Sequence, residues 1–153
     1  MIATRRSALA TLGGMALAGP ALAQLRPSMR VYKDPNCDCC TGWVKHVRAA
    51  GFTVEVIEAV DMDAIKARLG IPNSLASCHT AAIDDYLIEG HVPATEIVRL
   101  LAERPRALGL AVPDMPIGSP GMEVPGSKPD IYQVVLFGPG QIPYARYRGA
   151  ERI

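Results

Sequence analysis

Three of the four cysteines in this 153-residue chain fall within four consecutive positions, at Cys37, Cys39 and Cys40. An apolar run leads into this cysteine triplet and a helical pattern leads out of it, so we expect the triplet at the N-terminus of a helix. A thiol there has a lowered pKa, because unpaired backbone N–H groups and the helix dipole favour the thiolate. Thiolates are nucleophiles and also soft ligands for Cu(I), zinc or iron–sulfur clusters. The triplet therefore predicts a metal site or a redox dithiol.

The fourth cysteine, Cys78, is followed directly by His79 in a predicted strand at residues 77–83. If this strand lies beside the first one, Cys78 comes near the triplet as a fourth sulfur ligand; the alternative is a buried free thiol. Alternation along a strand should turn His79 to the face opposite Cys78, unless a bulge intervenes. Two roles stay open for His79: it contacts the metal, or it holds the surroundings of Cys78 by hydrogen bonds. We expect His91 to be structural rather than a ligand, and His46 to be solvated in mid-helix.

Two methionines, Met115 and Met122, lie in a segment at residues 109–129 that is rich in proline and glycine. Methionine usually fills cores, but this segment lacks the apolar periodicity that packing requires. A thioether is a soft, uncharged ligand that suits Cu(I) and binds zinc poorly. A third thiol also fits a simple dithiol oxidant badly, whereas bridging thiolates let several copper ions share few ligands. Thiolates with loop methionines therefore predict copper.

The N-terminal residues 1–23 have the three-part plan of an export signal. Arg5 and Arg6 precede an acid-free apolar run, and a small-residue pattern ending at Ala23 marks the expected cleavage site. The pair of arginines favours the twin-arginine type over an ordinary secretory signal. The apolar run is shorter than the roughly 20 residues that span a bilayer, and no later stretch could span one. Export would place the thiols in an oxidising compartment, where two disulfides are the ordinary expectation, but a bond between adjacent cysteines would be strained.

The composition fits one folded domain at residues 24–153, with 49% hydrophobic and 20% charged residues. The formal net charge of +1 provides no basic field, so we expect no nucleic-acid partner.

The chain reads as a strand, helix and strand, then a short helix begun by Asp61, a hairpin turning at Asp84, a helix opened by Pro93, and a final strand pair. The predicted helices and strands cover residues 29–32, 41–50, 52–57, 62–69, 77–83, 86–92, 93–104, 131–137 and 144–147. These elements predict an α/β, thioredoxin-like fold, a central mixed β-sheet flanked by helices, with a long Pro/Gly/Met loop insertion. Cys37 and Cys40 form a C-x-x-C pair where thioredoxins carry theirs.

Four motifs occur in one order: residues 34–43 with the triplet and Trp43, residues 77–80 around Cys78, residues 89–94, and residues 115–123 with both methionines. Together they resemble the signatures of the exported CopG-type copper-resistance family, long catalogued as a domain of unknown function. The resemblance covers residues 29–147, nearly the whole mature chain. At the hairpin tip the chain departs from the family, because Asp84 and Asp85 stand where a glycine is expected.

The resemblance implies a thioredoxin-like protein of the periplasm that binds copper as a thiolate-bridged multinuclear Cu(I) cluster. Carried over by position, the four cysteines are the cluster thiolates, and the further candidate ligands are a histidine and the loop methionines: Cys37, Cys39, Cys40, Cys78, His79, Met115 and Met122. Copper ions are the expected ligand, and other periplasmic copper-handling proteins are the expected partners.

We predict a copper-binding protein for copper resistance or homeostasis, and a metal-binding protein rather than an enzyme. Clustering thiolates around Cu(I) would lower the concentration of free, redox-active ion. One alternative is a thiol–disulfide or copper oxidoreductase that uses Cys37 and Cys40 as its working pair. Another is a structural zinc module, in which Met115 and Met122 have no role.

Overall fold

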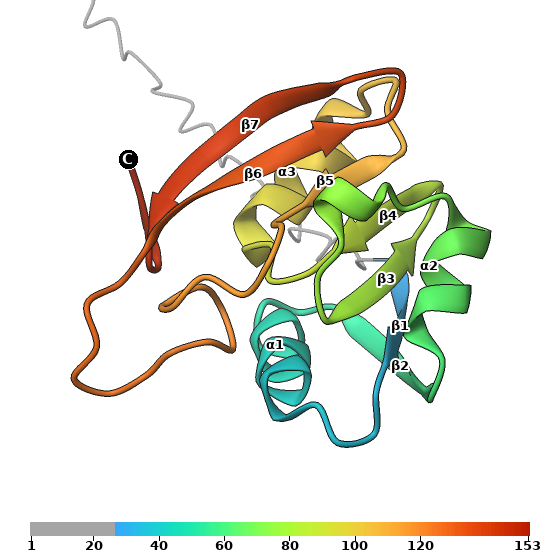
Figure 1. The fold of residues 1–153 in the computed structure, drawn as a ribbon. Coiled ribbons are helices and arrows are strands. Elements are labelled where there is room, and N and C mark those ends of the chain that lie inside the picture. The colour runs from blue at the N-terminus through green and yellow to red at the C-terminus, as the bar shows by residue number, and fades with distance from the viewer. Residues whose placement is uncertain (1–26) are drawn as a thin grey trace, which may run out of the picture.

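The computed structural model describes residues 27–153 (Figure 1). Its strands form one mixed, eight-stranded sheet in the order β2-β1-β3-β4-β5-β6-β7-β8. The predicted signal peptide lies outside the described residues. Within them, no helix is both long and apolar enough to cross a membrane. The elements are β1 (Ser28–Lys33), α1 (Asp38–Ala49), β2 (Thr53–Glu58), α2 (Met62–Leu69), η1 (Asn73–Leu75), β3 (His79–Ile83), β4 (Tyr86–Glu89), α3 (Ala94–Glu103), β5 (Gly109–Ala111), β6 (Ile131–Phe137), β7 (Gln141–Arg148) and β8 (Glu151–Arg152).

The first three elements form the predicted βαβ unit, with β1 and β2 parallel. α1 buries Trp43, Val44 and Val47 in the main core, which the apolar residues of α3 also enter. α1 begins at Asp38, three residues earlier than predicted, because Cys37 is its N-cap and the Cys37 Sγ accepts from the Cys40 backbone N–H at 3.3 Å. Periodicity could not show this turn, since the triplet has no apolar repeat.

The hairpin of β3 and β4 is confirmed, and it places the cysteines at one end of the sheet. β3 runs antiparallel to β1, so Lys33 at the end of β1 pairs with His79 at the start of β3. The triplet follows β1 and Cys78 precedes β3, so both lie at the same end. The hairpin turns without glycine because Asp84 adopts a φ of 48°, a left-handed conformation that aspartate tolerates better than most residues.

The segment at residues 109–129 was predicted to be a loop throughout, which is wrong at its start. Residues Gly109–Ala111 form β5, a fully buried strand parallel to β4. Gly109 is required there, because a Cβ would lie 1.7 Å from the Leu87 carbonyl oxygen. Residues 112–130 contain no helix or strand.

The last three strands complete the sheet. β7 begins three residues before its predicted start, and β8 was not predicted. The mixed α/β class with a central sheet is confirmed. The thioredoxin-like layout and the status of the loop as an insertion stay predictions.

Candidate metal centre

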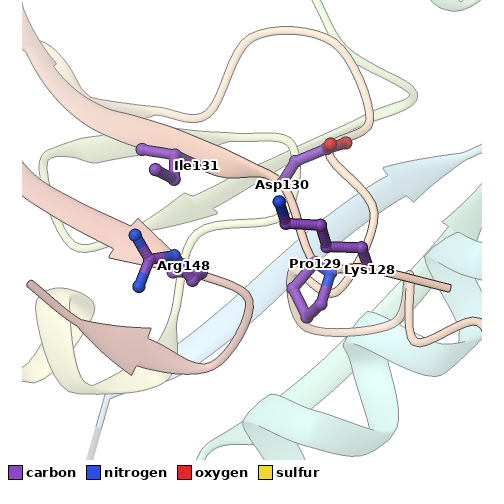
Figure 2. Close-up of a pocket in the computed structure, with 5 residues that line it drawn as sticks. All are labelled: Lys128, Pro129, Asp130, Ile131 and Arg148. Atoms are coloured by element: carbon purple, nitrogen blue, oxygen red, sulfur yellow. The ribbon is translucent and has the colours of Figure 1, made fainter.

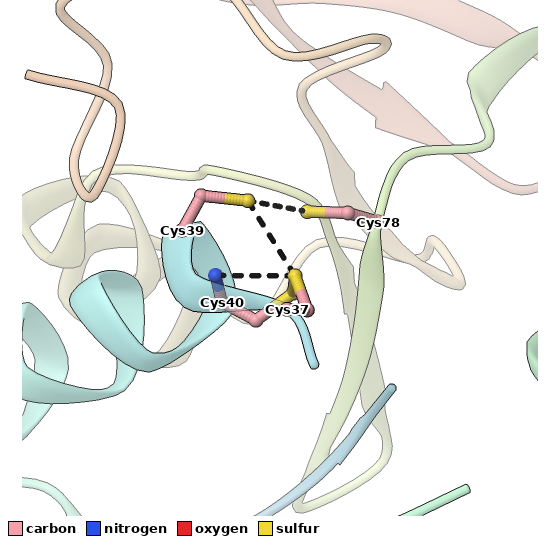
Figure 3. A group of neighbouring side chains, drawn as sticks. All are labelled: Cys37, Cys39, Cys40 and Cys78. Carbon is pink, nitrogen blue, oxygen red and sulfur yellow. Dashed lines mark hydrogen bonds between the residues drawn. A yellow bond between two sulfur atoms is a disulfide. The ribbon is translucent and has the colours of Figure 1, made fainter. Parts of the chain in front are cut away.

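The structure gathers all four cysteines of the chain at one point (Figure 3). The Cys39 Sγ lies 3.5 Å from the Cys37 Sγ and 3.7 Å from the Cys78 Sγ, so Cys39 links the triplet to the fourth cysteine. Cys37 and Cys40 are joined by a disulfide, whereas Cys39 and Cys78 are free thiols. Cys40 is buried, and the other three cysteines are partly buried residues. The sequence-based expectation that Cys78 comes near the triplet agrees with this arrangement.

A second group of possible ligands shares Cys78 with two histidines. The Cys78 Sγ lies 3.0 Å from the His91 Nε2 and 3.3 Å from the His79 Nδ1. The three ligand atoms lie within 4.8 Å of one another, as do the four sulfurs. Because Cys78 belongs to both groups, the candidate sulfur and imidazole ligands form one continuous set.

His91 is held in one orientation by the loop that follows β5. Its Nδ1 lies 2.8 Å from the Pro120 carbonyl oxygen, which can only accept a hydrogen bond, so Nδ1 carries the proton. The Nε2 lone pair therefore faces Cys78, as in a histidine poised to bind a metal. We expected His91 to be structural, and its position beside Cys78 makes it a further candidate ligand. The available signal was its place at the end of the hairpin strand that pairs with the strand after Cys78.

His79 is fully buried against Trp43, with ring centroids 4.4 Å apart, and meets the His91 ring edge-on at 5.1 Å. Its Nε2 has no hydrogen-bond partner among the described residues. The expectation that His79 faces away from Cys78 is wrong, because Cys78 lies just before β3 and strand alternation does not reach it.

Burial keeps this second group uncharged in the absence of metal. Burial, with a smaller contribution from Cys39, raises the pKa of the Cys78 thiol to about 12. Burial also lowers the pKa of His91 and brings that of His79 well below its ordinary value. At neutral pH Cys78 is thus a thiol beside neutral imidazoles, and a metal ion that binds its sulfur must displace the proton.

The methionine-bearing segment passes directly over the start of α1. A Cβ on Gly121 would lie 2.5 Å from the Trp43 backbone nitrogen and 2.6 Å from the Cys39 carbonyl oxygen, so only glycine allows this approach. The Met115 side chain is 49% exposed and Met122 is partly buried. Their roles as ligands stay predictions.

A buried polar network lies behind Cys78, on the side of the sheet that α2 covers. The fully buried Glu89 carboxylate accepts from the Lys66 ammonium, the Ser77 backbone N–H and the Thr80 hydroxyl, each at 2.6 Å. Burial raises the pKa of Glu89, and the Lys66 charge opposes that rise. Because Ser77 immediately precedes Cys78, this network holds the backbone that carries the thiol.

Solvent reaches Cys78 through a pocket of about 370 Å³. It is lined by Asp34, Val60, Asp61, Met62, Asp63, Lys66, Ser77 and Cys78. A larger pocket of about 650 Å³ at the start of β6 and the end of β7 contains no cysteine or histidine (Figure 2). Only the first of these two pockets opens onto the gathered ligands.

His46 has a different role from the one predicted. It is partly buried, and its Nε2 accepts from the Ala94 backbone N–H at 3.0 Å. α1 packs beside the first residue of α3, so the imidazole caps an N–H that has no partner within the helix. The helical pattern alone could not reveal this neighbour.

The fold and these candidate ligands define a class of protein: a mixed α/β protein with a sulfur-rich site suited to a soft metal ion. The family described as "Protein of unknown function, DUF411" matches residues 75–122. Two solved structures, Form 2 and Form 1 of copper resistance protein CopG, are each 47% identical to the chain. Form 2 aligns with a TM-score of 0.75 over 80% of this chain and 98% of its own, and Form 1 with 0.74 over 81% and 99%. No curated protein matches the chain. The chain belongs to the CopG copper-resistance family, as its motifs predicted.

Proposed function

We propose that this protein binds Cu(I) at the gathered cysteines and histidines, and that it serves copper resistance or homeostasis. The observation that carries the proposal is the convergence of four sulfurs and two neutral imidazoles within two overlapping groups. Soft thiolates and imidazoles suit Cu(I), and the two related structures carry the name copper resistance protein. Cys37 and Cys40 become ligands once a thiol reductant such as glutathione reduces their disulfide: two reductant thiols supply two electrons and two protons and become one disulfide, and Cu(I) then displaces the protons.

Cys39 is suited to bridge metal ions. Its sulfur has a neighbouring sulfur on either side, at 3.5 Å and 3.7 Å, so one thiolate can be shared by two ions. Cys78 can be shared in the same way between the sulfur group and His91. These distances support a multinuclear cluster in which the cysteines bridge and the histidines complete the coordination. Met115 and Met122 are proposed as further ligands because a thioether suits Cu(I).

We propose the periplasm as the site of action. The support is the signal pattern at residues 1–23, with its paired arginines and its small-residue cleavage site. In that compartment the pocket beside Cys78 would receive Cu(I) from, or release it to, other copper-handling proteins.

A Cu(I) titration of the reduced, oxygen-free protein tests the proposal. With residues 24–153 and a chromophoric chelator as competitor, we expect more than one equivalent of Cu(I) per chain. Cys39→Ser should lower the stoichiometry to one or less, and His91→Gln should weaken binding about tenfold or more. His46→Gln, a histidine change away from the site, is the matched control and should bind as the unmodified protein does. An unmodified protein that takes up no Cu(I) would refute the proposal.

The Cys37–Cys40 disulfide favours one second candidate, an oxidoreductase. In its copper form, two Cu(I) ions would each give one electron to the disulfide, which takes up two protons and becomes two thiols. Assays of disulfide reduction and of copper oxidation, on the unmodified protein and on Cys39→Ser, distinguish the two candidates. Turnover that the Cys39→Ser variant retains favours the enzyme. Loss of copper binding in the variant, with no turnover in the variant or the unmodified protein, favours storage or transfer. A structural zinc module would instead retain zinc over Cu(I) and be insensitive to changes at Met115 and Met122.

A further inference from the structure

Lys33, the last residue of β1, is buried, and its ammonium has no acidic partner within the part of the chain that the structure describes. The residue is 4% exposed, and its ammonium donates to the carbonyl oxygens of Asp34 at 2.8 Å and Pro35 at 3.3 Å. Among the ion pairs of residues 27–153 none involves Lys33, whereas the other buried lysine, Lys66, is paired with Glu89. Burying an ammonium without an anion is costly, so such a charge requires an explanation.

The surroundings of Lys33 point to the candidate metal centre. The two carbonyls that it binds belong to the short connection between β1 and Cys37. Lys33 also pairs with His79 across the sheet, and paired residues of adjacent strands project to the same face. Burial is the main cause of the lowered pKa of His79, and the charge of Lys33 is a minor one, which agrees with this placement. The ammonium therefore lies against the loop that presents the triplet and on the face that carries His79.

We propose that Lys33 is the counter-charge for the reduced thiolates of the triplet and for the copper–thiolate complex that they form. In the structure Cys37 and Cys40 are bonded to each other, so neither carries a charge. Reduction and loss of protons make thiolates, and four thiolates that hold fewer than four Cu(I) ions keep a net negative charge. Reduction of the disulfide thus adds negative charge beside the loop whose carbonyl oxygens Lys33 binds.

This inference deepens the proposed function and rests on it for the copper-loaded state. Its part on the reduced thiolates is independent of copper. Lys33 is a positioning and charge-compensating residue in this view, since it acts through the loop and the thiolates and is not itself a ligand. A purely structural role, in which Lys33 only ties the loop carbonyls, is the competing explanation.

Three variants separate charge from hydrogen bonding. Lys33→Arg keeps the charge, Lys33→Gln keeps a donor without the charge, and Lys45→Gln removes the same charge from an exposed position on α1. For each, the metal-free equilibrium between the Cys37–Cys40 disulfide and glutathione is measured at pH 8, followed by Cu(I) affinity in competition with a chelator. In the first measurement two glutathione thiols reduce the disulfide and become one glutathione disulfide.

We expect Lys33→Gln to shift the glutathione equilibrium about tenfold toward the disulfide, equivalent to about 30 mV for a two-electron couple, and to weaken Cu(I) binding about tenfold. Lys33→Arg and Lys45→Gln should stay within about threefold of the unmodified protein in both measurements. Equal effects of Lys33→Arg and Lys33→Gln would assign Lys33 to the loop alone, and no effect of Lys33→Gln would also overturn the inference. If the unmodified protein binds no Cu(I) but Lys33→Gln still shifts the glutathione equilibrium, the proposed function fails while the counter-charge to the thiolates stands.

Discussion

Replacing Lys66 by methionine should destabilise the protein, and the loss should grow as the pH rises. Lys66 Nζ lies 2.6 Å from the carboxylate of Glu89, which is fully buried. Methionine preserves most of the side-chain volume, so the main change is the loss of the ammonium. The remaining donors to Glu89 are then the Ser77 N–H and the Thr80 hydroxyl, both neutral.

The expected loss is about 3 kcal/mol at pH 8, near the lower end of the range for breaking a buried ion pair. The loss is limited because the carboxyl of Glu89 can take up a proton instead of remaining a buried anion. Burial already raises its pKa above the ordinary 4.5, and without Lys66 the pKa rises further. The folded state then holds a proton that the unfolded state releases, so stability is greater below the folded pKa and falls as the pH rises through it. At pH 5.5 the loss should be smaller by about 1 kcal/mol or more.

Urea unfolding of the reduced, metal-free protein, followed by circular dichroism at both pH values, measures this loss. The double variant Lys66→Met with Glu89→Gln should be more stable than the sum of the single changes predicts, by about 2 kcal/mol. Lys45→Met, on the exposed face of α1, should change stability by less than about 0.5 kcal/mol. A loss at Lys66 that is the same at pH 5.5 and pH 8, or no larger than that of the Lys45 control, would refute the reasoning.

Three further substitutions test the contacts that α1 makes with its neighbours. Gly121→Ala should lower the melting temperature and weaken Cu(I) binding, because a Cβ would lie 2.5 Å from the Trp43 backbone nitrogen and because Gly121 has a φ of 87°. An unchanged melting temperature would contradict the close approach. Trp43→Phe should cost about 2–4 kcal/mol in urea unfolding, because it leaves a cavity and removes the 2.9 Å hydrogen bond to the Val92 carbonyl. His46→Gln should flatten the dependence of stability on pH. Burial lowers the pKa of His46, so in the unmodified protein the unfolded state takes up a proton at a higher pH than the folded state does. The stability of the unmodified protein therefore falls as the pH drops below about 6.5, by at most about 1.4 kcal/mol per pH unit. Gln can still accept from the Ala94 N–H, so melting at pH 7.5 should change little, and an unaltered pH profile would remove His46 from the acid response.

Much of the secondary structure could be predicted from local patterns. α2 begins after Asp61, whose carboxylate accepts from the Ala64 N–H at 2.9 Å, and ends at Leu69, which Gly70 follows as a C-cap in the left-handed conformation. These signals lie within a few residues of each other, so they can be read along the chain. β5 could not be predicted, because three residues are too few to show a period. Its strand pairing comes from β4 and β6, which lie on either side of it.

The sequence by itself determined the chemistry of the site. Cysteine thiolates and thioethers are soft ligands wherever they lie, so the types and spacing of these residues indicated a copper protein before any contact was known. Tertiary structure decided which side chains meet. His91 reaches Cys78 because the hairpin returns to the same end of the sheet, and because Gly90, at a φ of 70°, packs where a Cβ would lie 2.6 Å from the Ser77 side chain. The burial of Lys33, and its lack of an acidic partner among residues 27–153, are likewise visible only in three dimensions, because both depend on segments that are distant in the chain.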